Sequence, residues 1–246
     1  MKNKKSLGQH WLYNRAILDE IALLAGDGDL CVEIGPGLGT LTSSLLKRFS
    51  KVVAVEFDEN LAANLPKSFP GKNLEVVNED ILKFDFSSFK KSYAVVGNIP
   101  YYITSPIIEK LLTISNLPER VVLLIQKEVA ERILDEKETV LSLFVKNRAR
   151  VFSGPVVLKE EFTPPPKVDS QVIVLEPKKP EVSEEVFKII RMGFSAPRKK
   201  LISNLSQLKS REELSEIFSK LKISLDSRPA DLKLGDWQKL YEIIMS

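Results

Sequence analysis

The chain has 246 residues, of which 43% are hydrophobic and 28% are charged. This composition is typical of a soluble globular protein, and the length suffices for one large domain or for a large domain with a small one. The net charge is only +3, so the overall charge balance does not by itself indicate a nucleic-acid partner.

The chain has one cysteine, Cys31, and one histidine, His10. An internal disulfide and a zinc site built from cysteine and histidine are therefore excluded, and we expect no metal. No apolar run approaches the roughly 18 residues that span a membrane. The basic start of the chain leads into a polar segment and not into the apolar core of a signal peptide. We therefore expect a cytoplasmic protein that does not bind a membrane.

Positive charge is concentrated in two places. The first 15 residues contain four basic side chains and no acidic one, and a second cluster lies near the C-terminus. The lysines and arginines that matter here are Lys2, Lys4, Lys5, Arg15, Arg198, Lys199 and Lys200. Such clusters suit contacts with phosphate groups, although solvated surface charge produces the same pattern.

Predicted helices and strands alternate from residue 14 to residue 177. Asn14 suits the cap of a first, amphipathic helix, whose apolar residues are Ile17, Leu18, Ile21, Leu24 and Ala25. Strands are predicted at 30–34, 51–57, 74–77, 93–97 and 120–126, and helices at 38–49, 58–65 and 105–114. Two further apolar runs, 151–158 and 171–175, flank a proline-rich loop.

Almost entirely apolar strands that alternate with helices indicate an α/β fold with a parallel sheet covered on both faces. The last two runs predict a terminal antiparallel hairpin, which gives a mostly parallel sheet of seven strands. A stiff polar linker at 176–180 follows. We therefore expect a domain of residues 1–177, with a basic N-terminal arm at 1–13, and a small all-helical domain of residues 178–246. Its helices are predicted at 184–194, 198–208, 212–221 and 236–245.

The first strand leads into a glycine-rich loop. Glu33 precedes Gly35, Gly37 and Gly39, and glycines between a strand and a helix let a ligand approach the backbone closely. Alone, this spacing is compatible with any dinucleotide-binding domain. Glu33 itself suits either fixing the loop or reaching a ligand through water.

Polar residues also follow the next three strands. Glu56 ends the second, where an acid can accept hydrogen bonds from both ribose hydroxyls, and Phe57 follows it. Asp80, before Ile81, comes at the end of the third strand and suits an adenine amine. Asn98 ends the fourth. Each alone reads equally well as an exposed strand end, but four in order at one sheet edge indicate a site for an adenosine-bearing ligand.

The segment after the fourth strand, Asn98-Ile99-Pro100-Tyr101-Tyr102, suits a flat ring that carries an amine. The Asn98 side-chain oxygen and a carbonyl beside Pro100 can accept hydrogen bonds from the amine, and Tyr101 can stack on the ring. A strand-end turn with surface tyrosines is the plainer interpretation. The glycine run lacks the full G-x-G-x-x-G pattern, and no hydride-transfer partner follows the sheet, so methyl transfer is favoured over nicotinamide chemistry.

Five motifs in order make the chain resemble the ribosomal RNA adenine dimethyltransferase family, and most closely its small-subunit branch. They are Gly8-Gln9-His10-Trp11-Leu12, Glu33-Ile34-Gly35-Pro36-Gly37-Leu38-Gly39, the Asn98 to Tyr102 segment, Gln126-Lys127-Glu128-Val129-Ala130 and Phe162-Thr163-Pro164-Pro165-Pro166-Lys167-Val168-Asp169-Ser170. The resemblance covers nearly the whole chain. It implies a Rossmann-like domain that uses S-adenosylmethionine (SAM) and a C-terminal domain that binds RNA or the ribosome.

The family dimethylates the N6 amines of two adjacent adenosines in the 3′-terminal hairpin of small-subunit ribosomal RNA. By resemblance, the SAM site is lined by His10, Leu12, Glu33, Gly35, Gly37, Glu56, Phe57, Asp80, Ile81 and Asn98. The target base is held by Asn98, Ile99, Pro100 and Tyr101, with Phe162 as a second stacking face. The RNA-facing cations are Lys2, Lys4, Lys5, Arg198, Lys199 and Lys200.

Two positions depart from the family pattern. The N-terminal motif usually reads Gln-Asn-Phe-Leu, whereas this chain has His10 and Trp11, which changes the contact expected at position 10. The C-terminal motif usually reads Arg-Arg-Lys, whereas Pro197 precedes Arg198 here, so one cation is missing.

The expected partner is small-subunit ribosomal RNA or the immature small subunit, bound by a monomer. Three alternatives remain. They are a dimethylase of large-subunit ribosomal RNA, a ribosome-assembly factor that acts by binding alone, and, more distantly, a nicotinamide-dependent oxidoreductase.

Overall fold

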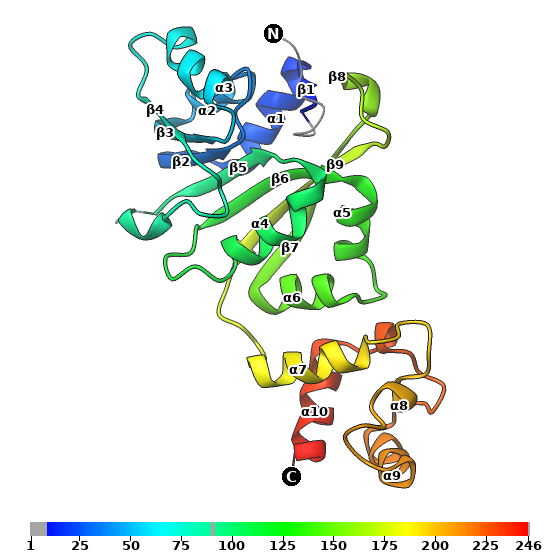
Figure 1. Ribbon diagram of the computed structural model, residues 1–246. Coiled ribbons are helices and arrows are strands. Elements are labelled where there is room, and N and C mark those ends of the chain that lie inside the picture. Colours follow the sequence, from blue (N-terminus) through cyan, green and yellow to red (C-terminus); the bar gives the residue numbers. More distant parts are fainter. Residues whose placement is uncertain (1–8, 90–91, 246) are drawn as a thin grey trace. The chain divides into compact units, whose positions relative to one another are not determined.

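The structure is a computed structural model that describes residues 9–89 and 92–245. The chain folds into two compact units (Figure 1). The first unit runs to Ala130 and also contains Arg150–Pro177, and the second contains Glu131–Ala149 and the residues from Lys178 onward. The break after residue 177 falls at the predicted linker. Residues 131–149, however, belong to the second unit and not, as expected from the sequence, to the first.

The first unit is built on a seven-stranded sheet with the strand order β4-β3-β2-β5-β6-β9-β7. Its strands are β2 (Gly28–Ile34), β3 (Phe49–Glu56), β4 (Leu74–Asn78), β5 (Ala94–Asn98), β6 (Arg120–Gln126), β7 (Ala149–Val157) and β9 (Ser170–Pro177). Neighbouring strands from β4 to β6 run parallel, and β9 runs antiparallel to β6. This confirms the predicted α/β fold with a mostly parallel sheet.

Helices α1 (Arg15–Ala25), α2 (Thr42–Leu45), α3 (Glu59–Asn64), α4 (Thr104–Leu111) and α5 (Lys127–Leu134) accompany the sheet, together with the short 3₁₀ helices η2 (Leu65–Ser68), η3 (Phe86–Ser88), η4 (Tyr101–Ile103) and η5 (Lys159–Glu161). Asn14 caps α1 as predicted, because its side-chain oxygen accepts from the Ala16 and Ile17 amides. The buried face of α1, with Leu18 and Ile21, packs in one core cluster with Val96 and Val122 of the sheet. Burying these side chains provides the main driving force for this layer.

The predicted helix over 38–49 is wrong for most of its length. Gly39 has a φ of +82°, which belongs to the left-handed region and interrupts a helix. Only Thr42–Leu45 is α-helical, and β3 already begins at Phe49, which pairs with Gly28 of β2. The connection is therefore a glycine turn followed by a single helical turn.

The second unit is helical in its described residues. Its helices are α6 (Val140–Arg148), α7 (Glu184–Gly193), α8 (Leu201–Asn204), α9 (Arg211–Leu221) and α10 (Leu234–Met245), with η6 (Pro229–Asp231) before the last. The predicted helix over 198–208 shrinks to α8, where the Asn204 side chain donates to the carbonyls of Gly193 and Ala196. Asparagine amides that bond backbone groups in this way favour helix ends over helix interiors.

Glu138 joins the segments of this unit. Its carboxylate is 3% exposed and accepts from Lys146 at 2.9 Å and from Lys233 at 3.1 Å. Its backbone N–H donates to the Ala230 carbonyl at 2.9 Å. These bonds explain why α6 belongs with the C-terminal helices.

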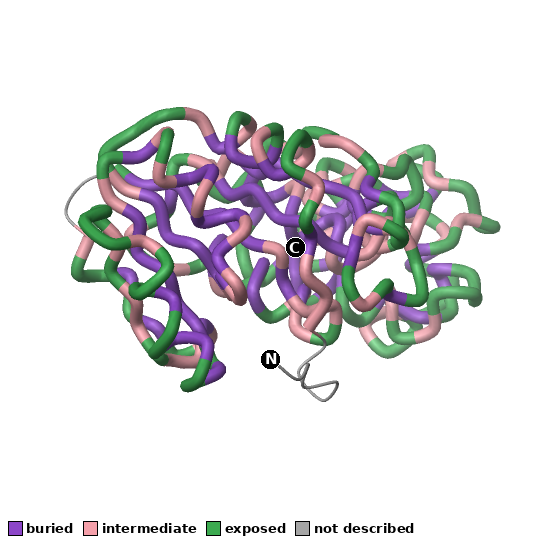
Figure 2. The backbone as a smooth tube through the Cα atoms, turned by 90° about the horizontal axis from the view of Figure 1, so that it is seen from above, coloured by how far each residue is buried: buried purple, intermediate pink, exposed green. Residues whose placement is uncertain are grey.

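A second, two-stranded sheet in the first unit pairs β1 (Trp11–Leu12) with β8 (Phe162–Thr163). Buried positions follow the interior segments of each unit, and exposed ones follow the turns (Figure 2). Among the described residues no helix combines the length and the apolar character needed to cross a membrane.

Candidate active site

A cavity of about 250 Å³ lies at the carboxyl ends of β2, β3 and β5 in the first unit. Most of its lining comes from five segments that are separated in the sequence. These are Gln9–Leu12, the glycine loop after β2, the end of β3 with Phe57, the segment from Glu79 to Leu82, and the segment from Asn98 to Ile103. A ligand site at the carboxyl edge of a parallel sheet is what the topology favours.

The glycine loop has the backbone geometry that the sequence predicts. Gly35 and Gly37 have φ values of +64° and +56°, which residues other than glycine rarely adopt. A Cβ on Gly37 would lie 3.2 Å from Nε1 of Trp11, whereas a Cβ on Gly35 would meet no atom within 4 Å. The loop therefore packs closely against the N-terminal segment at Gly37 and leaves open space at Gly35, where a ligand can reach the backbone.

Glu33 is buried behind this loop, with 1% exposure. Its Oε2 accepts from Oγ1 of Thr42 at 2.6 Å. Burial raises the pKa of Glu33 to about 8, against the opposite effect of the Thr42 hydrogen bond. Of the two roles suggested by the sequence, this contact matches fixing the loop to the first turn of α2.

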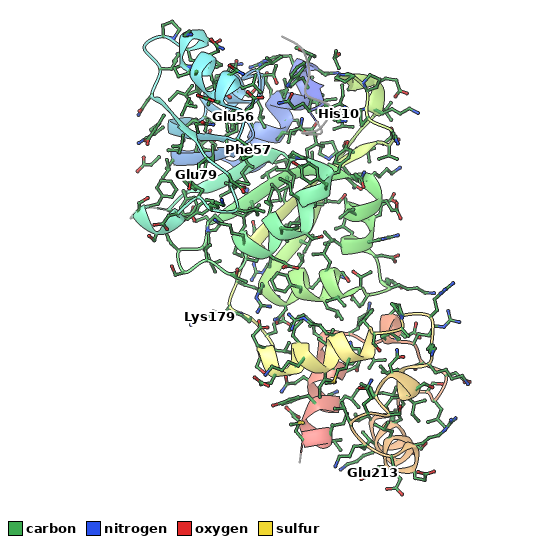
Figure 3. All side chains as sticks on the ribbon, in the orientation of Figure 1. His10, Glu56, Phe57, Glu79, Lys179 and Glu213 are labelled. Carbon is green, nitrogen blue, oxygen red and sulfur yellow. The ribbon has the colours of Figure 1, made fainter. Side chains whose placement is uncertain are left out.

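Glu56 ends β3, as predicted, with both carboxylate oxygens fixed. Oε2 accepts from the Gly37 amide at 3.1 Å, and Oε1 accepts from the Asp58 amide at 2.8 Å. Burial raises the pKa of Glu56, while these backbone bonds act in the opposite direction. The next residue, Phe57, is 64% exposed and also lines the cavity. Figure 3 shows Glu56, Phe57 and Glu79 on the β3–β4 side of the unit and His10 beside β1 and β8.

Asp80 lies two residues beyond the end of β4 and not at the strand end itself. Its Oδ1 accepts from the Leu82 amide at 2.9 Å, and Ile81 beside it is buried. Lys110 of α4 fixes this segment, because its Nζ donates to the carbonyls of Leu82 at 2.9 Å and Phe84 at 2.7 Å. Burial lowers the pKa of Lys110. Lys110 was not predicted as a site residue, because a single lysine in a mostly apolar helix is its only signal in the sequence.

Asn98 is held by the N-terminal segment. Its Nδ2 donates to the His10 carbonyl at 3.1 Å, which fixes the orientation of the amide. The opposite atom, Oδ1, accepts no hydrogen bond from the described part of the chain. Asn98 therefore contributes an acceptor to the cavity that it lines.

The backbone carbonyls of Ile99 and Pro100 differ in whether they already accept a hydrogen bond. The Pro100 carbonyl accepts from the Ile103 amide at 3.2 Å, whereas the described residues place no donor on the Ile99 carbonyl. The Ile99 side chain is buried, with 2% exposure. Of the two carbonyls that the sequence left open, the Ile99 carbonyl is therefore the second acceptor.

Tyr101 lines the cavity with a fixed ring. Its hydroxyl shares a hydrogen bond of 2.7 Å with Oγ of Ser170, and burial raises its pKa. The adjacent Tyr102 is 65% exposed and lines the same cavity.

Phe162, predicted as a second stacking face, is not among the residues that line the cavity. It is 2% exposed and belongs to the core cluster. In β8 its Cα partner is Leu12 of β1, and both residues belong to the same core cluster. Phe162 instead helps to hold the N-terminal segment.

The predicted RNA-facing cations fall into two groups. Arg198, Lys199 and Lys200 are exposed in the second unit, and Lys200 forms an ion pair with Asp226. Lys2, Lys4 and Lys5 lie outside the described residues.

The family model that matches the chain is described as ribosomal RNA adenine dimethylase, and the match covers residues 1–246. The ribosomal RNA small subunit methyltransferase A of Nostoc sp. is 38% identical, with 99% of this chain and 98% of the relative covered. The protein of that name from Mycoplasma mycoides is 33% identical, with the same coverage.

Two solved structures have TM-scores of 0.79. A dimethyladenosine transferase from Plasmodium falciparum is 31% identical, covering 94% of this chain and 96% of that chain. The 23S rRNA methyltransferase ErmE is 25% identical, covering 96% of this chain and 100% of that chain. The fold of this chain is thus the Rossmann-like fold of methyltransferases.

Proposed function

Because the chain belongs to the ribosomal RNA adenine dimethylase family, we propose that it dimethylates the N6 amines of two adjacent adenosines in the 3′-terminal hairpin loop of small-subunit ribosomal RNA. It is a SAM-dependent ribosomal RNA adenine dimethyltransferase. The small-subunit target follows the names of the relatives. The observation that carries the proposal is the fixed acceptor of Asn98 beside Tyr101 in the cavity.

The side chains in this cavity fit SAM. Glu56 would accept hydrogen bonds from the ribose hydroxyls through the lone pairs that Gly37 and Asp58 leave available. Asp80 would accept from the adenine amine, with Phe57 and Ile81 beside the ring. The open space at Gly35 would receive the methionine part. When bound, SAM supplies a methyl group that is already activated.

Asn98 and Ile99 would shape the nucleophile. The exocyclic amine of adenine is a poor nucleophile because its lone pair is delocalised into the ring. Two acceptors, Oδ1 of Asn98 and the Ile99 carbonyl, favour a pyramidal amine and stabilise the positive charge that develops on attack. A neutral amide also avoids an ion pair with the sulfonium of the cofactor. The remaining requirements are alignment and exclusion of water.

The target adenosine must leave its stack, at a cost of a few kcal/mol. Stacking on Tyr101 offsets this cost, at roughly 1–3 kcal/mol per base. The exposed cations of the second unit would contact phosphates and add affinity with little sequence information. We propose that the second unit binds the RNA or the ribosome, and that the enzyme acts as a cytoplasmic monomer on immature small subunits.

The test is methyl transfer from labelled SAM to small subunits that lack the modification, followed by mapping of the modified adenosines. Asn98→Ala should reduce methyl transfer by about 100- to 1000-fold and leave SAM affinity within about twofold. Asn73→Ala is the matched control, since Asn73 is not among the residues that line the cavity and its side chain donates to the Ser50 carbonyl. Equal losses of binding and transfer for Asn98→Ala would contradict the division of roles.

The same mapping separates the alternatives. Modification of large-subunit RNA instead would favour the activity named for the ErmE structure, which has the same TM-score as the Plasmodium enzyme. Binding to small subunits without methyl transfer would favour an assembly factor.

A further inference from the structure

His10 is held in place at three points. Its backbone carbonyl accepts from Nδ2 of Asn98, and its ring Nδ1 lies 2.7 Å from the Pro164 carbonyl. Because a carbonyl only accepts, Nδ1 carries the proton of this hydrogen bond. The next two residues, Trp11 and Leu12, pair with β8. The ring of His10 is therefore fixed by residues more than 150 positions away in the chain.

The His10 ring is nearly parallel to the ring of Tyr101. The ring centroids are 6.3 Å apart and the planes differ by 19°, and both residues line the cavity. Carbon atoms pack at about 3.5 Å, so a flat base between two parallel rings needs about 7 Å. The two centroids are closer together than this, so a base can enter only if the N-terminal segment moves outward.

Among the described residues, His10 is the one aromatic side chain whose ring stacks with that of Tyr101. Phe162 is buried in the core. Trp11 packs against Gly37, and Phe57 lies beside Glu56 on the β3–β4 side of the unit, whereas His10 lies beside β1 and β8 (Figure 3).

We propose that His10 is the second stacking contact of the target adenine, so that the base enters between His10 and Tyr101. This assignment rests on the proposed function and moves the His10 ring from the cofactor set to the base set. Asn98, whose amide is bound to the same residue, then presents Oδ1 at the edge of the stacked base. The histidine that departs from the family motif thus supplies the aromatic face that Phe162 does not.

The experiment compares His10→Ala and His10→Phe with Glu161→Ala, using the full chain and small subunits that lack the modification. Glu161 is the matched control because its Oε2 accepts from Nδ2 of Asn14 at 2.9 Å. It therefore ties the same two segments together without lining the cavity. Three quantities are measured: kcat/KM for the subunits, the SAM dissociation constant by calorimetry, and the fluorescence of 2-aminopurine at the target position in the presence of S-adenosylhomocysteine.

His10→Ala should lower kcat/KM by roughly 5- to 150-fold, which corresponds to the loss of one stacked base contact. It should leave the SAM dissociation constant within about twofold and reduce the quenching of 2-aminopurine. His10→Phe should stay within about threefold of the wild type because it keeps an aromatic face. Glu161→Ala should leave all three quantities unchanged.

Equal losses for His10→Phe and His10→Ala would overturn the proposal, since the hydrogen bond to Pro164 would then be what matters. A SAM dissociation constant that rises in parallel with the loss of kcat/KM would also overturn it. An inactive wild type would count against the proposed function and remove this inference with it. An active wild type matched by an equally active His10→Ala would overturn this inference alone.

Discussion

Glu33 and Glu56 are two buried carboxyl groups at the ends of adjacent strands, and their partners separate their roles. Glu33 accepts from the Thr42 hydroxyl behind the loop. Glu56 accepts from two backbone amides at the cavity wall. Backbone N–H groups favour a charged carboxylate, so Glu56 retains the acceptor strength that a sugar-binding residue needs. Glu33, with a pKa raised to about 8 by burial, suits a neutral structural role.

The raised pKa of Glu33 makes stability depend on pH. Below pH 4.5, the ordinary pKa, both the folded and the unfolded chain hold the proton. Between 4.5 and about 8 the unfolded chain loses it first, so this group lowers the free energy of unfolding as pH rises, by up to about 1.4 kcal/mol per pH unit. Above about 8 the effect is constant.

Glu33→Gln should remove this dependence, because a glutamine oxygen still accepts from Thr42 and does not titrate. Urea unfolding of both proteins at pH 5 and pH 8 measures the difference. We expect the variant to gain stability over the wild type at pH 8 relative to pH 5. The same difference at both pH values would show that Glu33 keeps its ordinary pKa.

Glu56→Gln should weaken SAM binding by roughly 10- to 100-fold, because hydrogen bonds to a charged group are lost. Calorimetry without RNA measures this directly. Glu75→Gln is the control on the neighbouring strand, where the carboxylate pairs with Lys51 at 2.6 Å and is half exposed. A dissociation constant unchanged from the wild type would remove Glu56 from the site.

At the scale of elements, the segment after β4 depends on a neighbouring helix. Lys110 of α4 donates to two carbonyls of this segment, and its ammonium also lies 5.6 Å from the centroid of the Phe86 ring. A cation over an aromatic face is attracted by the ring. The position of Asp80 and Ile81 is therefore set by contacts with a side chain 30 residues further along the chain.

Lys110→Met keeps the apolar stem and removes the two hydrogen bonds. It should raise the SAM dissociation constant by about 5- to 30-fold, since the adenine-binding segment loses its support, while kcat at saturating SAM changes little. The exposed neighbour Glu109→Gln is the control on the same helix. A loss of kcat without a change in SAM affinity would show that Lys110 does not support the SAM-binding segment.

The sequence predicted strands better than it predicted connections. The ends of β3 at Glu56 and β5 at Asn98 are confirmed, because apolar strands followed by polar residues are a strong signal. The pairing of β1 with β8 was not predictable, since each strand has two residues and their contact depends on tertiary packing. The burial of Phe162 was missed for the same reason. The roles of the site residues stay predictions.

At the scale of the whole molecule, the break after residue 177 was readable from the polar linker, but the membership of α6 in the second unit was not. That membership rests on the bonds of Glu138 with Lys233 and Ala230, which lie more than 90 positions further along the chain. Local sequence patterns do not predict contacts between residues so far apart in the chain. The fold class, by contrast, follows from periodicity along the chain.

Charge on the second unit should control the salt dependence of RNA binding. Lys200 is paired with Asp226, whereas the described residues place no acidic partner on Arg198 or Lys199. The double variant Arg198→Gln with Lys199→Gln should weaken binding and reduce the slope of log K against log salt by about 1.5. SAM affinity should stay unchanged. A slope equal to that of the wild type would remove both residues from the RNA contact.

The link between His10 and Pro164 also has a consequence for the order in which the enzyme becomes active. During synthesis Glu56, Asp80 and Asn98 emerge early, but the Pro164 carbonyl that holds the His10 ring emerges much later. A nascent chain that ends before residue 164 has the acceptor side chains without the closed wall that positions Asn98. The cavity is therefore completed only after two thirds of the chain has been made.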